Sequence, residues 1–175
     1  MDEYKNEIFD QIISEVRRRL FDESMPRIKK CLDNLSEKDI WWKPNDNSNS
    51  VGNLILHLCG NIRQWMLSGL GGSVDNRVRQ KEFDERDPLP KEALIQNLEQ
   101  VMREVDELLN RLHPESLVER KVVQGFEETG ISILIHVIEH FSYHVGQIVY
   151  VTKATKDIDL RFYGNKDLNV TGKGS

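Results

Sequence analysis

Cysteine is scarce in this sequence: the chain has only Cys31 and Cys59, and they do not form a Cys-x-x-Cys pair. We therefore expect neither a disulfide framework nor a structural zinc knuckle, and a reducing compartment is the default. The chain also lacks the run of about 18 apolar residues that a membrane-spanning helix needs. Its first residues, MDEYKNEIFD, lack the apolar stretch of a signal peptide. These absences predict a cytoplasmic protein that does not contact a membrane.

Positive charge is also limited, since 24 Lys and Arg residues stand against 29 Asp and Glu residues for a net charge of −5. Nucleic-acid-binding proteins usually carry a dense basic stripe. The short run Arg17–Arg19 has acidic residues on both sides, as on a solvated helix face. We therefore expect no nucleic-acid partner. With 175 residues, of which 38% are hydrophobic, the chain is long enough for one globular domain, expected at residues 1–170, with a mobile tail at 171–175.

Apolar residues recur at intervals of three and four in four stretches, the pattern of helices that bury one face. The expected helices span about residues 3–35, 51–70, 91–112 and 131–155. Pro26 should kink or break the first helix near Met25, and Ser50 is suited to cap the second. Residues 118–124 could be extended, but nothing in the sequence offers them a partner strand. The predicted fold class is all-α, a four-helix bundle with long connections between the helices.

Histidines are concentrated in the second and fourth of these helices. His136, His140 and His144 lie at i, i+4 and i+8, so neighbouring members share a helix face and can hold one metal ion together. All three cannot, because His136 and His144 are about 12 Å apart along the axis. A third ligand must come from another helix, and His57 is the candidate. Spacing alone does not choose between the two possible pairs, and hydrogen-bonded core histidines are an alternative.

One competing interpretation is a metalloprotease. Residues 136–140 spell His-x-x-Glu-His, the pattern of inverted zincins, in which His136 and His140 would be the ligands. Only 35 residues follow His140, too few for the large second domain that such enzymes need. This interpretation would also leave His144 without a role, so we do not favour it.

The two histidine-containing stretches resemble the DinB-like superfamily of metal-binding bundle proteins. The shared features are a Gly-Asn-Leu-x-x-His-Leu stretch at residues 52–58 and a His-x-x-x-His-x-Gly-Gln pattern at residues 140–147. The upstream Trp42-x-Pro44 and Asn49-Ser50 agree with it, and the likeness covers about residues 5–155. In this family one histidine of the second helix and two of the fourth bind the metal. The resemblance therefore implies His57, His140 and His144 as ligands, with His136 as a neighbouring residue of mainly structural importance.

The resemblance also implies a four-helix bundle, often a homodimer, and in some members a transferase or isomerase that uses a low-molecular-weight thiol. We accordingly expect a metal-dependent enzyme, a thiol S-transferase-like protein or a hydrolase, that acts on a small-molecule substrate. The alternative is a non-catalytic metal-binding stress-response bundle. Three His ligands suit zinc, nickel, iron or manganese. Around the ligands we expect five further pocket residues: Asn61, Trp65, His136, Tyr143 and Gln147.

Overall fold

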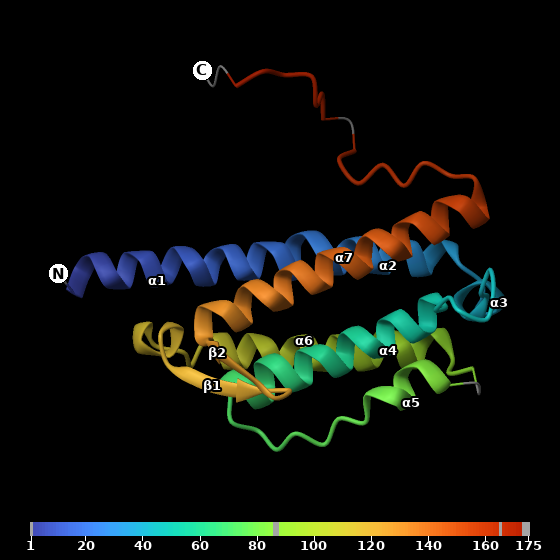
Figure 1. Ribbon diagram of the computed structural model, residues 1–175. Helices are drawn as coiled ribbons and strands as arrows, with labels where there is room; N and C mark the ends of the chain where they lie inside the picture. Colours follow the sequence, from blue (N-terminus) through green and yellow to red (C-terminus); the bar gives the residue numbers. More distant parts are fainter. Residues whose placement is uncertain (1, 86–87, 165, 173–175) are drawn as a thin grey trace.

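The computed structural model describes residues 2–85, 88–164 and 166–172 and consists mainly of helices. Four long helical rods run side by side in two layers (Figure 1). One layer pairs the N-terminal rod with the last helix, and the other pairs the rods of the second and third predicted helices. The all-α four-helix bundle predicted from the sequence is confirmed. Its rods are α1 (Asp2–Arg17) continuing through Arg18–Ser24 into α2 (Met25–Asn34); α4 (Val51–Ile62) continuing through Arg63–Leu70; α6 (Lys91–Leu109); and α7 (Gly130–Lys156).

The first rod does not break at Pro26. Residues 18–24 between α1 and α2 form a π-helical turn, in which the Met25 N–H donates to the Leu20 carbonyl five residues earlier. Pro26 is the second residue of α2, which directly follows this π-helical turn. The rod therefore continues with a changed hydrogen-bonding pattern: of the predicted kink or break near Met25, the break does not occur.

The second rod begins where the sequence predicts, because Ser50 caps it. The Asn53 N–H donates to Ser50 Oγ over 3.1 Å, and the Ser50 N–H donates to Asn53 Oδ1 over 3.2 Å. This reciprocal pair satisfies two backbone groups that would otherwise be unpaired at the helix start. Beyond the cap, α4 is buried on nearly every side because α3 (Glu37–Trp41), α5 (Arg79–Asp84), α6 and α7 all pack against it. A side chain of α4 that carries chemistry is therefore enclosed by neighbouring elements.

The connections contain more structure than the sequence predicts. Short helices α3 (Glu37–Trp41) and α5 (Arg79–Asp84) and a 3-10 turn (Pro114–Leu117) lie between the rods. Strand β1 (Arg120–Val123) pairs with β2 (Phe126–Thr129) in an antiparallel hairpin, with Arg120 opposite Thr129. Our expectation that the extended piece at 118–124 has no partner strand is wrong. Gln124 and Gly125 both have positive φ, 54° and 84°, as a two-residue hairpin turn requires.

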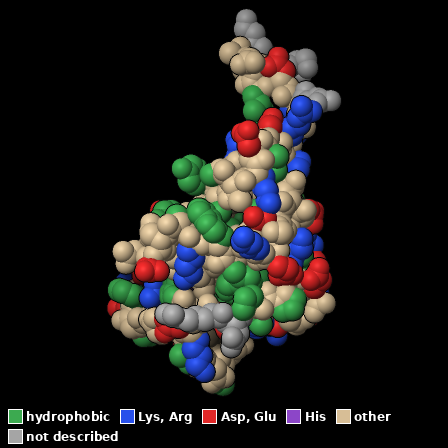
Figure 2. Space-filling model, turned by 90° about the vertical axis from the view of Figure 1, so that its right-hand side faces the viewer, with side chains coloured by type: hydrophobic (Ala, Val, Ile, Leu, Met, Phe, Trp, Pro, Cys, Tyr) green, Lys and Arg blue, Asp and Glu red, His purple; other side chains and the backbone are tan. Residues whose placement is uncertain are grey.

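The surface mixes charge of both signs. On the face shown in Figure 2, Lys and Arg side chains are interspersed with Asp and Glu and with hydrophobic groups. No helix in the described part of the chain is both long and apolar enough to cross a bilayer. Of the predicted mobile tail, residues 171 and 172 are exposed and residues 173–175 lie outside the described residues.

Candidate metal centre

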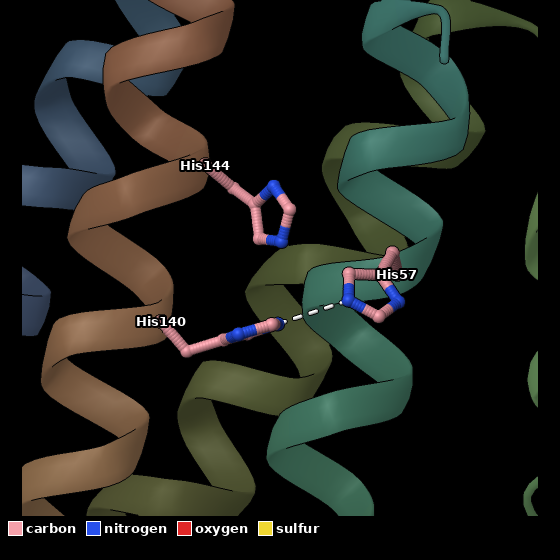
Figure 3. A group of neighbouring side chains, drawn as sticks. All are labelled: His57, His140 and His144. Carbon is pink, nitrogen blue, oxygen red and sulfur yellow. Dashed lines mark hydrogen bonds between the residues drawn. The ribbon is translucent and has the colours of Figure 1, made fainter. Parts of the chain in front are cut away.

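Three imidazoles from two rods meet between α4 and α7. His140 and His144 lie one turn apart on α7 and point towards His57 on α4 (Figure 3). One nitrogen of each ring can be chosen so that all three lie within 4.8 Å of one another. The Nε2 atoms of His140 and His57 are 2.9 Å apart. Since metal-bound imidazole nitrogens lie about 2.0–2.1 Å from a zinc ion, this group is compatible with holding one divalent cation.

His136 does not belong to this group. Its ring stacks on Trp65 with centroids 3.7 Å apart and an interplanar angle of 20°, and it lies parallel to His140 at 5.5 Å. Glu139, which would be the catalytic residue of an inverted zincin, is exposed. The fold therefore assembles His57 with His140 and His144, and the pair His136/His140 of the metalloprotease interpretation does not converge with a third ligand in the described part of the chain.

The His144 ring is held from behind by Gln147. Gln147 Oε1 lies 2.7 Å from His144 Nδ1. An amide oxygen can only accept, so Nδ1 carries the proton and Nε2 keeps its lone pair. Because Gln147 follows His144 by three residues on α7, the two side chains share a helix face. The sequence predicted Gln147 near the site, and the structure shows which atom it contacts.

His57 is held by a residue that the sequence analysis missed. Glu82 of α5 places Oε2 2.8 Å from His57 Nδ1 and is itself buried. Burial alone would raise the pKa of Glu82, but hydrogen bonds from Arg77 and His57 outweigh it and lower that pKa. Glu82 is thus a carboxylate and an acceptor, which places the proton of His57 on Nδ1 and turns Nε2 towards His140. The tautomer of His57 is therefore set in the same way as that of His144.

Gly60 explains how Glu82 reaches this position. A Cβ at residue 60 would lie 2.0 Å from Glu82 Oε1 and 3.0 Å from Arg77 Nε. The glycine therefore leaves space for the carboxylate that holds the imidazole, and a glycine within a buried helix was the available signal.

The remaining predicted pocket residues lie around the group at different depths. Asn61 Nδ2 is 3.5 Å from His136 Nε2. Trp65 is buried and donates from Nε1 to Gln124 Oε1 of the hairpin turn over 3.2 Å. Tyr143 is 63% exposed with its ring 5.0 Å from that of His144. The first two belong to the wall of the site, whereas Tyr143 lies at its solvent side.

The electrostatics favour neutral imidazoles. Burial, with added repulsion from His144 and His57, lowers the pKa of His140 from 6.5 to about 3. Burial also lowers the pKa of His144, although Gln147 opposes the shift. A metal ion requires deprotonated nitrogen ligands, so these rings are ready to bind at neutral pH. Imidazole nitrogens suit borderline cations such as zinc.

Comparisons with known proteins agree with this fold. A family model described as "Protein of unknown function (DUF1572)" matches residues 8–164. Among solved structures, a DinB-like protein from Bacillus cereus ATCC 10987 is similar, with a TM-score of 0.61, 17% sequence identity, and coverage of 77% of this chain and 87% of that chain. No curated protein matches the chain. The likeness confirms the DinB-like fold, and at this identity it shows the fold alone.

Proposed function

Since the chain belongs to the family described as protein of unknown function, DUF1572, we propose a function from the histidine group itself. His57, His140 and His144 bind one divalent metal ion, and the bound ion serves a reaction on a small molecule. The observation that carries the proposal is the convergence of three nitrogen donors within 4.8 Å from two separate helices. The two hydrogen bonds behind His57 and His144 support it, because each leaves Nε2 available to a cation.

The donor set supports a catalytic ion over a purely structural one. Structural zinc sites are closed by four protein ligands, whereas catalytic sites use three and leave a position open. The carboxylate that contacts the group, Glu82, bonds to Nδ1 of His57, and so it lies on the ring side away from Nε2. A cation held by the three rings would lower the pKa of a thiol or a water in its open position. This arrangement favours an enzyme over the non-catalytic stress-response bundle.

The residues around the group would position a substrate. Trp65 and His136 form a flat stacked wall beside His140, and the largely exposed Tyr143 places its ring beside His144. The proposed reaction is the attack of a low-molecular-weight thiol, or of water, on an electrophilic small molecule. The homodimer and the cytoplasmic location expected from the sequence stay predictions.

Metal content tests the proposal directly. The purified protein and its His57→Ala, His140→Ala and His144→Ala variants are loaded with Zn²⁺, desalted and analysed for bound metal. We expect about one ion per chain in the wild-type protein and a nearly empty site in each variant. His136→Ala is the matched control, because this histidine borders the group without joining it, and it should keep its metal. Full occupancy in the three ligand variants would refute the site, and loss in His136→Ala with retention in His144→Ala would restore the zincin interpretation.

A second experiment separates catalysis from simple metal holding. The zinc-loaded protein is screened for conjugation of a small thiol to model electrophiles, and for ester and amide hydrolysis, before and after treatment with a chelator. We expect an activity that disappears with the metal and returns on reloading. An activity indifferent to chelation would remove the proposed mechanism, and a stoichiometric ion without any activity would favour the non-catalytic bundle.

A further inference from the structure

Two buried charged side chains anchor the connection between α4 and α6. Residues 71–81 are exposed along their length apart from Arg77, and Figure 1 shows the segment crossing the outside of the bundle before α5. The side chains of Arg77 and Glu82 are only 4% and 10% exposed. These two groups therefore help to anchor this otherwise superficial segment, together with the Phe83 ring, whose centroid lies 4.9 Å from that of His57.

The two anchors are hydrogen-bonded to each other and to the second rod. Arg77 donates from Nε to Glu82 Oε1 over 2.7 Å and from Nη2 to Glu82 Oε2 over 2.9 Å. Its Nη1 donates to Gln64 Oε1 over 2.8 Å, and Asn53 Nδ2 donates to the Glu82 carbonyl over 2.9 Å. Burying an ion pair is costly unless the geometry is good and the remaining groups are satisfied. Here those conditions are met, with His57 Nδ1 as the last partner of the carboxylate.

This partner connects the segment to the proposed metal ligands. A carboxylate that accepts from Nδ1 fixes the ring orientation and raises the basicity of Nε2. Arg77 Nη2 also lies 3.2 Å from His57 Nδ1, but the proton of Nδ1 goes to the carboxylate, which can only accept. Arg77 therefore acts on His57 through Glu82, by fixing the carboxylate in place.

We infer that residues 73–85 are a working part of the metal centre: Glu82, held by Arg77, positions His57, so metal binding and docking of this connection stabilise each other. The inference rests on the proposed metal binding at His57, His140 and His144. Reciprocity follows from linkage, because a segment that strengthens metal binding by some factor is itself held more tightly by the metal by the same factor. Glu82 and Arg77 are positioning residues and do not touch the ion.

Zinc affinity gives the first test, measured by competition with a chelating indicator. Glu82→Gln removes the charge of the carboxylate, and we expect the Kd for Zn²⁺ to rise about 10- to 100-fold. The matched control is Glu99→Gln, which removes an exposed, Lys29-paired carboxylate far along the chain from the site and should leave the Kd unchanged. Gly60→Ala keeps every charge but puts a methyl group where Glu82 Oε1 lies. It should weaken Zn²⁺ binding in the same direction, and it gives the answer if Glu82→Gln does not fold.

Limited trypsin digestion gives the second test. Arg77, Arg79 and Lys81 are potential cleavage sites within the connection, and Arg111 and Lys121 provide reference sites in the next connection. Saturating Zn²⁺ should slow cleavage within 77–81 by about the factor by which Glu82→Gln weakens binding, and should leave cleavage at Arg111 and Lys121 unchanged. In Glu82→Gln the protection by Zn²⁺ should be lost.

The outcomes separate this inference from the function on which it rests. Zn²⁺ binding by the wild-type protein with an unchanged Kd in both Glu82→Gln and Gly60→Ala would overturn the inference and leave the metal site standing. Equal protection of both connections would show a global effect of the metal and would also overturn it. A wild-type protein that binds no Zn²⁺ would overturn the inference and the proposed function together.

Discussion

Replacing Gln147 by leucine tests how the α7 side of the site works. Gln147 Oε1 accepts from the Nδ1–H of His144 over 2.7 Å, and His144 is only 8% exposed. Leucine has a similar size and cannot accept, so the buried Nδ1–H loses its partner and the ring is no longer fixed with Nε2 towards His57. Loss of such a partner typically weakens metal binding about 10- to 100-fold, which corresponds to about 1.4–2.8 kcal/mol.

The assay is the Kd for Zn²⁺ by chelator competition, read across a short series. Gln147→Glu keeps an acceptor and adds a negative charge, which raises the basicity of the ring, so it should bind Zn²⁺ at least as tightly as the wild-type protein. Gln100→Leu is the control, because Gln100 is an exposed glutamine of α6 that bonds to the neighbouring side chains of Arg103 and Glu104. Equal Kd values for Gln147→Leu, Gln100→Leu and the wild-type protein would refute the reasoning.

Two further predictions follow from the titration of buried groups. The pKa of His140 is about 3 in the folded apo-protein, compared with a usual value of 6.5. Between these two pH values the unfolded state therefore binds more protons than the folded state. The thermal midpoint of chelator-treated protein should fall as the pH drops from about 6.5 towards 3. The midpoint of His140→Asn should fall less over the same range, and parallel curves of midpoint against pH for the two proteins would contradict this. Burial raises the pKa of the Cys59 thiol to about 12 and also raises that of Cys31. An aromatic disulfide reagent at pH 8 should therefore modify neither thiol until denaturant is added, and rapid labelling of the native protein would contradict the buried placement.

The long helices were predictable because each is specified locally. The rod from α4 starts after the Ser50–Asn53 capping box and ends with the glycines after Leu70, as its sequence pattern indicates. The apolar spacing of residues 91–109 likewise needs no information from distant residues. The π-helical turn before Pro26 was not predictable in this way, because the periodic pattern continues through it and only the hydrogen-bonding changes.

The connections were less predictable because their structure depends on neighbours that are distant in sequence. The hairpin turn uses Gln124-Gly125, whereas the strongest hairpin signals are Asn-Gly and Asp-Gly, and no residue of strand β2 is fully buried. Helix α5 has six residues and a charged sequence, and it packs against α4. Neither element has enough periodicity to be recognised without the surface it covers.

The candidate site likewise has one part that local sequence predicted and one part that depends on distant residues. His140, His144 and Gln147 lie within eight residues of one helix, so their shared face follows from helix geometry. Spacing alone did not decide whether His136 and His140 or His140 and His144 are the pair of ligands on α7. The position of His57 in the fold distinguishes the two pairs, since His57 meets His140 and His144. Glu82 lies 25 residues from His57, in a segment with several other acidic residues, so nothing local marked it as the partner of the imidazole.

The ligands on α7 and the ligand on α4 are supported in different ways. The α7 half carries its own support, because His144 and Gln147 stay together whenever that helix is formed. The α4 half depends on a surface connection, because the support of His57 comes from Glu82. If that connection detaches, the bundle keeps its rods and the α7 pair of imidazoles, but His57 loses the group that orients it. Metal affinity should therefore follow the docking of residues 73–85 more closely than the stability of the whole fold. Variants of Gly60 should change the Kd for Zn²⁺ without changing the free energy of unfolding.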